Sequence, residues 1–302
     1  MTNNNFNGEH CVVVGVDGSR SALHAVRWAA REALRRNVPL RLVHVCHLVP
    51  VRHPRQISPP PEYHAALLDQ GRHWLSEATE AARRAAPGGV VIADLRDGVT
   101  NDVLVAESKS AQLLVLGSRG LGGFASLLVG SVAVTVSAHA HCPVVVTHSG
   151  TADGVPPESG HIVVGFDGSD LSDAAMTFAC EAAAARGVSL VVVHTWFDID
   201  ASPTWATLPS TIDWQWVQAE EEQQLAERIG PWQSKFPHVE IRPLVRRGRP
   251  AHALLEHAAG AQLVVVGSRG HGAFVGLGLG SVSQALLHHA ECPVAVVRKE
   301  GV

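Results

Sequence analysis

Cysteine is scarce in this chain of 302 residues, which contains five, and no two of them form a CxxC pair. An odd number without paired spacing does not suggest a framework of disulfides. Because such frameworks belong to oxidising compartments, their absence leads us to expect a cytoplasmic protein. The cysteines are Cys11, Cys46, Cys142, Cys180 and Cys292.

Long hydrophobic runs are also lacking. Residues 1–10 are polar and contain no apolar signal core. The apolar runs elsewhere are short, and none approaches the roughly 20 residues needed to span a membrane. We therefore expect no membrane partner.

Positive charge is not in excess, since the formal net charge is −4. Such a chain has no basic field with which to neutralise nucleic-acid phosphates, so we expect no nucleic-acid partner. Arg246, Arg247 and Arg249 form a local cluster that we interpret as a solvated loop. The 46% of hydrophobic residues and 17% of charged residues exclude a disordered chain, and the length suits two compact domains.

Several enzyme motifs are missing. The chain contains neither GxxxxGK[ST], which excludes a P-loop ATPase, nor GxSxG, which leaves a hydrolase elbow unsupported. Residues 120–125 match GxGxxA, but that dinucleotide pattern should follow the first strand of its unit, and here it follows the fourth expected strand. The 18 histidines include two pairs near Cys142 and Cys292, yet HExxH is absent, so we favour surface or core roles over a metal site. These pairs are His139 with His141 and His288 with His289.

An internal repeat is what the sequence does contain. The segment VVGVDGS at residues 13–19 returns as VVGFDGS at residues 163–169, an offset of 150 positions. The segments LVH, LGSRG and CPV of the first half return at the same offset as VVH, VGSRG and CPV. One constant offset indicates a tandem duplication. We therefore expect domains at residues 1–148 and 161–302, joined by a linker at residues 149–160 that is rich in glycine, proline, serine and acid.

Strands and helices alternate within each repeat. The first repeat predicts apolar strands at residues 11–16, 40–46, 90–95, 113–116 and 144–147. Helical spacing of apolar residues predicts helices that cover residues 22–34, 63–86 and 131–140. This alternation predicts an α/β fold in which each repeat is a Rossmann-like, five-stranded parallel sheet flanked by helices.

Asp17 and its copy Asp167 directly follow the first strand of each repeat. In parallel sheets ligands bind beyond the carboxyl ends of the strands, where the strand order reverses. An aspartate there can instead be a turn residue or a helix N-cap. Ser19 and Ser169 could cap the helices, which leaves the aspartates available to a ligand.

A glycine-rich segment follows the fourth strand of each repeat. It contains Gly117-Ser118-Arg119-Gly120, then nine residues, then Gly130-Ser131 at the start of a helix, and it recurs with the same spacing in the second repeat. Glycines let the backbone approach an anion, and a helix N-terminus offers unpaired N–H groups to a phosphate. A flexible loop before a capped helix is the plainer interpretation, but two copies with identical spacing favour a phosphate site.

These residues carry a family resemblance that covers nearly the whole chain. The pattern G-x2-G-x9-G-[ST] after the fourth strand, with aspartate after the first, resembles the ATP-binding universal stress proteins, and the tandem arrangement is similar to their two-domain actinobacterial members. The resemblance implies an adenine nucleotide α-hydrolase-like fold, ATP as ligand and Mg²⁺ with its phosphates. It implies a nucleotide-dependent regulator of stress response or growth rather than an enzyme. A slow ATPase or a nucleotidyl-transfer enzyme is the alternative on the same fold.

The resemblance also implies which residues bind the nucleotide. Aspartates would lie against the adenosine, the residue after the second strand would present its backbone to the adenine edge, and the glycine-rich segment would hold the phosphates and ribose. In the first repeat these residues are Gly15, Asp17, Val45, Gly117, Ser118, Arg119, Gly120, Gly130, Ser131 and Val132. In the second repeat they are Gly165, Asp167, Thr195, Gly267, Ser268, Arg269, Gly270, Gly280, Ser281 and Val282. Only the second repeat has proline where the third helix would start, at Gly248-Arg249-Pro250 against Gly98-Val99-Thr100, which leaves the equivalence of the two sites open.

Two features concern surfaces. The last strands, residues 144–147 and 294–297, are apolar edges that would otherwise be exposed, so we expect the domains to pack through them as a pseudo-twofold pair. A further homodimer is compatible with the sequence, which holds no direct evidence for it. Five tryptophans crowd the second repeat and either line a nucleotide mouth or partner surface, or pack against the sister domain. They are Trp196, Trp205, Trp214, Trp216 and Trp232.

Overall fold

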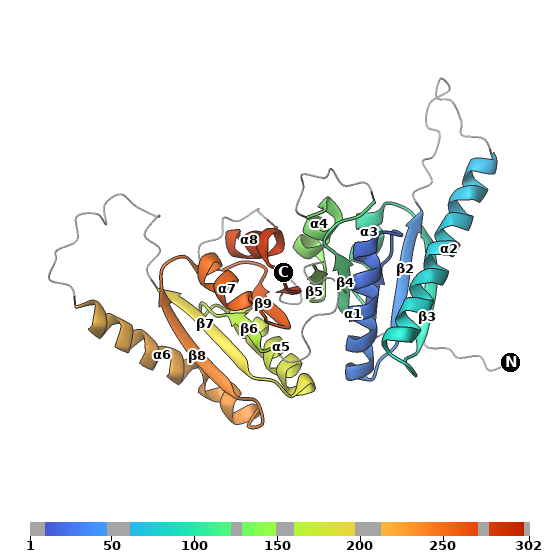
Figure 1. Ribbon diagram of the computed structural model, residues 1–302. Helices are drawn as coiled ribbons and strands as arrows, with labels where there is room; N and C mark the ends of the chain where they lie inside the picture. Colours follow the sequence, from blue (N-terminus) through green and yellow to red (C-terminus); the bar gives the residue numbers. More distant parts are fainter. Residues whose placement is uncertain are drawn as a thin grey trace, which may run out of the picture. The chain divides into compact units, whose positions relative to one another are not determined.

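The computed structural model describes residues 10–46, 61–121, 129–148, 160–196, 213–270 and 278–298. The chain divides into two compact units, residues 1–155 and 156–302. Each unit is described by itself (Figure 1). The residue pair Gly120 and Leu121 begins the GxGxxA match, and the rest of that match lies outside the described residues.

Unit 1 alternates strands and helices along the chain. Its elements are β1 (Cys11–Gly15), α1 (Arg20–Arg36), β2 (Leu40–Cys46), α2 (Pro61–Ala85), β3 (Val91–Asp97), α3 (Thr100–Glu107), β4 (Ala111–Gly117), α4 (Ser131–His139) and β5 (Val144–Thr147). The strands are parallel, in the order β3-β2-β1-β4-β5.

Unit 2 repeats this pattern. Its elements are β6 (Ile162–Gly165), α5 (Asp170–Arg186), β7 (Leu190–Trp196), α6 (Trp214–Lys235), β8 (Ile241–Arg247), α7 (Pro250–Ala258), β9 (Leu263–Gly267), α8 (Ser281–His289) and β10 (Val294–Val297). The order of the parallel strands is β8-β7-β6-β9-β10. The predicted fold of two parallel five-stranded α/β units is therefore confirmed.

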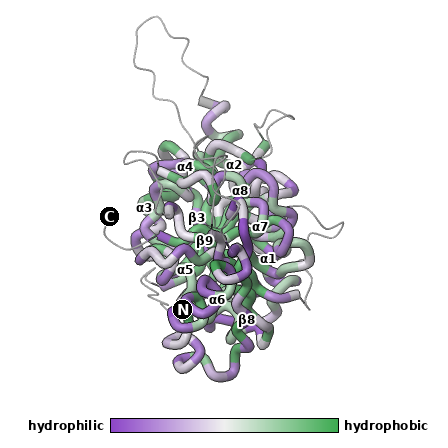
Figure 2. The backbone as a smooth tube through the Cα atoms, turned by 90° about the vertical axis from the view of Figure 1, so that its left-hand side faces the viewer, coloured by the Kyte–Doolittle hydropathy of each residue, from purple (hydrophilic) through white to green (hydrophobic). Residues whose placement is uncertain are grey.

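The apolar strands form the core of each unit. In β1 and β4 the valines and leucines at Val12 to Val14 and Leu113 to Val115 are fully buried, as strands covered on both faces must be. Helices α1 and α2 pack against each other, as do α3 and α4, so each sheet is a middle layer between helices. The inner strands are hydrophobic, the outer strands β3 and β8 also carry charged residues, and the helices alternate between hydrophobic and hydrophilic residues (Figure 2).

The strand order reverses between β1 and β4. The chain runs outward from β1 through β2 to β3, and then returns to place β4 on the other side of β1. The loops that leave the carboxyl ends of β1 and β4 therefore diverge to opposite faces, which opens a crevice between them. Unit 2 reverses in the same way between β6 and β9.

The third helix starts alike in both units. Val99 and Arg249 are the extended N-cap residues of α3 and α7, and each follows a glycine with positive φ, 141° at Gly98 and 129° at Gly248. Pro250 occupies the first turn of α7, where its missing N–H costs no hydrogen bond. The proline thus leaves the start of the helix unchanged.

Two further sequence expectations concern membranes and thiols. Among the described helices, none combines the length and the apolar character that crossing a bilayer requires. All five cysteines lie in described segments, keep their thiols and are buried. Burial raises the pKa of the Cys142 and Cys292 thiols to about 12.

Candidate functional site

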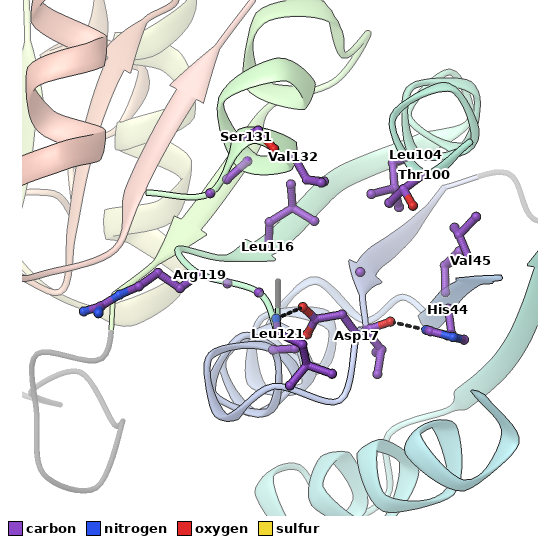
Figure 3. Close-up of a pocket in the computed structure, with 18 of the residues that line it drawn as sticks. Asp17, His44, Val45, Thr100, Leu104, Leu116, Arg119, Leu121, Ser131 and Val132 are labelled. Atoms are coloured by element: carbon purple, nitrogen blue, oxygen red, sulfur yellow. Dashed lines mark hydrogen bonds between the residues drawn. The ribbon is translucent and has the colours of Figure 1, made fainter. Parts of the chain in front are cut away.

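A cavity of about 560 Å³ opens at the carboxyl ends of β1, β2 and β4 in unit 1 (Figure 3). It lies at the reversal of strand order, where the sequence places its ligand site. Nine of the ten residues predicted for the first repeat line it. They are Gly15, Asp17, Val45, Gly117, Arg119, Gly120, Gly130, Ser131 and Val132.

Asp17 joins the first loop to the glycine-rich segment. Its Oδ1 accepts a hydrogen bond from the Ser19 N–H at 3.0 Å, and its Oδ2 accepts one from the Leu121 N–H at 3.0 Å. Ser19 is the N-cap of α1, because its Oγ accepts from the Ala22 N–H at 3.0 Å. Asp17 therefore has a turn role, but Ser19 takes the capping role and the aspartate carboxylate still borders the cavity.

Two glycines at and after the end of β4 each lie close to a neighbouring group, one to helix α1 and the other to the Asp17 carboxylate. A Cβ at Gly117 would lie 2.5 Å from the Ser21 Oγ and would overlap the first turn of α1. A Cβ at Gly120 would lie 2.5 Å from the Asp17 Oδ2. The absence of a side chain at Gly117 thus permits helix packing, whereas its absence at Gly120 keeps the space beside the Asp17 carboxylate open.

Helix α4 presents its N-terminus to the cavity. Gly130 is its N-cap and supplies no capping side chain, while Ser131, Val132 and Ala133 of the first turn line the cavity. The first N–H groups of a helix lack intrahelical partners and carry its positive dipole end. This end of the cavity is therefore suited to an anion.

Two predicted contributions turn out differently placed. Ser118 is only 3% exposed, donates its N–H to the Thr147 carbonyl at 2.9 Å and does not line the cavity. Arg119 borders the cavity, but Figure 3 shows its guanidinium pointing away from Asp17 and Ser131. Its charge would reach a phosphate only after the side chain rotates.

Residues that were not predicted complete the wall. Trp74 of α2 and Thr100 and Leu104 of α3 line the cavity. His44 also lines it, and its Nδ1 lies 2.6 Å from the Val16 carbonyl oxygen. Sequence spacing alone carries no signal for Trp74, because α2 reaches the cavity only through its packing on the sheet.

Unit 2 repeats the aspartate turn, the glycine beside the aspartate and the helix without a capping side chain. The Asp167 Oδ1 accepts from the Ser169 N–H at 3.0 Å and from its Oγ at 2.6 Å, and Ser169 caps α5. A Cβ at Gly270 would lie 2.5 Å from the Asp167 Oδ2. Gly280 is the N-cap of α8 and provides no capping side chain.

The other residues predicted for unit 2 lie at the same end of its sheet. Gly165, Thr195 and Gly267 lie at the carboxyl ends of β6, β7 and β9. Ser281 and Val282 begin α8. Ser268 is buried like its counterpart Ser118, with exposed fractions of 1% and 3%. Arg269 follows Ser268 in the chain.

The tryptophans of unit 2 divide into different environments. Trp196 and Trp214 lie 5.8 Å apart, and the Arg247 guanidinium stands 4.1 Å from the Trp214 ring. Trp232 donates its Nε1–H to the Thr177 Oγ1 at 3.0 Å, which packs it within its own unit. Trp216 is 66% exposed, and Trp205 lies outside the described residues. Within the described segments, histidine, cysteine and acidic side chains nowhere gather in threes that could hold a metal ion.

Comparisons with known proteins agree with the repeat. The sequence profile of the Universal stress protein family matches residues 10–148 and again residues 158–298. A universal stress protein of Mycobacterium tuberculosis strain H37Rv is 39% identical over 292 residues, covering 95% of this chain and 96% of its own length. One from Mycobacterium bovis is 40% identical over 299 residues, covering 96% of this chain and 98% of its own length. Among solved structures, a universal stress protein from Archaeoglobus fulgidus is similar in fold, with a TM-score of 0.68 at 20% identity, covering 95% of this chain and 98% of that one.

Proposed function

Because the chain belongs to the universal stress protein family and carries the family's domain in tandem, we propose that it is a regulator of stress response or growth that acts by binding an adenine nucleotide, ATP with Mg²⁺. The observation that carries the proposal is the cavity of unit 1. One space of about 560 Å³, within the usual range of small-molecule sites, borders the Asp17 carboxylate, the end of β2 and the N-terminus of α4.

The ligand is assigned along the cavity by chemistry. The apolar end at Val43 and Val45 suits the adenine, with the Val45 backbone available to its polar edge. The Asp17 carboxylate suits the ribose hydroxyls, because it accepts hydrogen bonds and would repel phosphate. The N–H groups at Gly120 and Ser131 suit the phosphates, whereas the Gly130 N–H is donated to the Ser118 carbonyl at 2.7 Å. Mg²⁺ fits this arrangement, since it binds through phosphate oxygens and waters without a dedicated protein cage.

A regulator is favoured over an efficient enzyme by what surrounds the phosphates. Catalysis of phosphoryl transfer needs charged groups aimed at the transferring phosphoryl group. Among the described residues that line the cavity there is no lysine, and Arg119 points away. We therefore propose that the protein regulates through whether the site holds a nucleotide, rather than through a reaction of that nucleotide.

Titration calorimetry with Mg-ATP on nucleotide-free protein tests the binding. We expect two sites per chain with micromolar-range affinity, and Gly120→Glu should remove the site of unit 1. The new carboxylate would stand beside Asp17 in the space assigned to the ligand and repel its phosphates. Loss of two or three charge-assisted contacts lowers affinity at least about a hundredfold. Gly270→Glu should remove the site of unit 2 independently.

Gly230→Glu is the matched control, because a Cβ at Gly230 meets no atom within 4 Å. Unchanged ATP affinity in a folded variant that carries both Gly120→Glu and Gly270→Glu would overturn the placement of the phosphates. The regulatory half is tested by complementation of a deletion strain. The double variant should fail to restore stress tolerance or growth control, and full complementation by a variant that cannot bind ATP would contradict regulation by the nucleotide.

A further inference from the structure

The wall that α2 contributes to the cavity of unit 1 is aromatic. Trp74 lines the cavity, and its ring lies so close over Gly18 that a Cβ on that glycine would overlap it. The ring also meets His44 edge-on, with centroids 5.2 Å apart and planes at 77°. Gly18 has φ of +82°, so glycine serves both the turn and the approach of the ring.

This wall lies beside the first loop and β2. Gly18 follows Asp17, and His44 precedes Val45, the residue at the end of β2 that is proposed to meet the base. The hydrogen bond from His44 to the Val16 carbonyl holds the imidazole against the Trp74 ring. The indole is thereby positioned by α2, β2 and the first loop together.

Unit 2 carries different side chains at the same place. The strands that follow α2 and α6 begin at Val91 and Ile241, 150 positions apart, so Trp74 corresponds to Gln224. The Arg228 guanidinium, one helical turn further on, lies over Gly168 as the Trp74 ring lies over Gly18. The His194 Nε2 lies 3.3 Å from a Glu221 carboxylate oxygen.

The volume of the missing indole is partly empty in unit 2. A recess of about 130 Å³ is lined there by Phe166, His194, Glu221, Gln224, Leu225 and Arg228. Four of these six side chains are polar or charged. The aromatic wall of unit 1 is thus replaced in unit 2 by a wall of mainly polar and charged side chains.

The two walls offer a nucleobase different amounts of stacking surface. An aromatic face stacks on any nucleobase, and replacing it with alanine typically weakens binding on the order of tenfold to a hundredfold. A guanidinium attracts carboxylates and phosphates and offers a base a smaller stacking surface than an indole does. We propose that Trp74 makes the site of unit 1 select its ligand through the base, whereas the site of unit 2, with Gln224 and Arg228 at that place, depends less on the base; this inference rests on the proposed function.

The test compares ATP with inorganic tripolyphosphate, which has the phosphates and no base, by calorimetry on the full chain. In a Gly270→Glu background that leaves unit 1 as the binding site, Trp74→Ala should weaken ATP binding at least tenfold and leave tripolyphosphate binding within about twofold. Trp74→Phe should restore most of the ATP affinity. Trp216→Ala is the control, because that tryptophan is exposed and belongs to unit 2.

The reciprocal exchange keeps the inference testable should Trp74→Ala fail to fold. In a Gly120→Glu background, Gln224→Trp combined with Arg228→Ala should raise the ratio of ATP to tripolyphosphate affinity at unit 2 about tenfold. Unchanged ATP affinity in folded Trp74→Ala, equal losses for both ligands, or an unchanged ratio in the reciprocal variant would each overturn the inference. Failure of the proposed function looks different, since wild-type protein would then bind neither ligand or would bind despite both glutamate substitutions.

Discussion

At the scale of single residues, the pairing of Asp17 with Gly120 shows how a motif can have two roles. The carboxylate closes its own turn through Ser19 and reaches the Leu121 N–H across the cavity mouth. The second hydrogen bond occupies an N–H of the segment that is proposed to meet phosphate. Ligand binding therefore has to be compatible with this bond, or replace it.

The cysteines provide a residue-scale prediction about alkaline stability. Burial raises the pKa of the Cys142 and Cys292 thiols to about 12, so both stay protonated in the folded protein while an unfolded thiol ionises near pH 8.5–9. The contribution of the two thiols to the free energy of unfolding is thus constant below about pH 8.5. The free energy of unfolding then falls as pH rises from there toward 12. Each thiol should lower the free energy of unfolding by up to about 1.4 kcal/mol per pH unit in that window.

Chemical denaturation at a series of pH values from 7.5 to about 10.5 measures this effect. Cys142→Ala combined with Cys292→Ala is expected to be less stable at pH 7.5, because the cavity costs packing, but to lose less stability on the way to about pH 10.5. Identical pH slopes in wild type and variant would contradict the prediction.

At the scale of elements, two helix starts shape the site. Helix α1 begins with a side-chain cap from Ser19, whereas α4 begins at Gly130 with none. The first loop is thereby fixed internally, and the N-terminus of α4 keeps its N–H groups for the cavity. The same contrast between Ser169 and Gly280 recurs in α5 and α8.

Removal of the α1 cap should destabilise unit 1. Ser19→Ala loses the bond to the Ala22 N–H and the bond that its Oγ donates to the Arg119 carbonyl at 3.2 Å. We expect the free energy of unfolding to fall by about 1–2 kcal/mol, measured by urea denaturation. Ser19→Asp can still cap the helix and should recover part of the lost free energy of unfolding. If Ser19→Asp loses as much stability as Ser19→Ala, capping is not the cause.

At the scale of the whole molecule, each unit ends its sheet on a short apolar strand. Within their units β5 pairs with β4, and β10 pairs with β9. Valine-rich edges that remained open would invite aggregation. We therefore keep the proposal that the two units pack through β5 and β10 as a pseudo-twofold pair.

Hydrogen–deuterium exchange on the full chain tests this packing. Amides of β5 and β10 should exchange more slowly than those of β3 and β8, which lie at the opposite edges of the same two sheets. These outer strands are the reference, since each also pairs with one strand of its own unit, although their side chains are more exposed than those of β5 and β10. Equally fast exchange of all four strands would refute the proposal.

The amino-acid sequence was sufficient to predict the duplication, the strand and helix order of both units, and the meeting of Asp17 with the glycine-rich segment. These follow from local periodicity and from the rule that the carboxyl ends of parallel strands share one edge of the sheet, so they need no knowledge of side-chain packing.

The folded structure was needed to show that Trp74 and Thr100 border the cavity, that Ser118 is buried without lining it, that Arg119 points away, and that Arg228 takes the place of the indole in unit 2. Each of these depends on how a helix rests on the sheet or on which rotamer a long side chain adopts. A linear spacing rule does not contain such distances, because helices α2 and α6 share a position in the chain order but cover the first loop with different side chains.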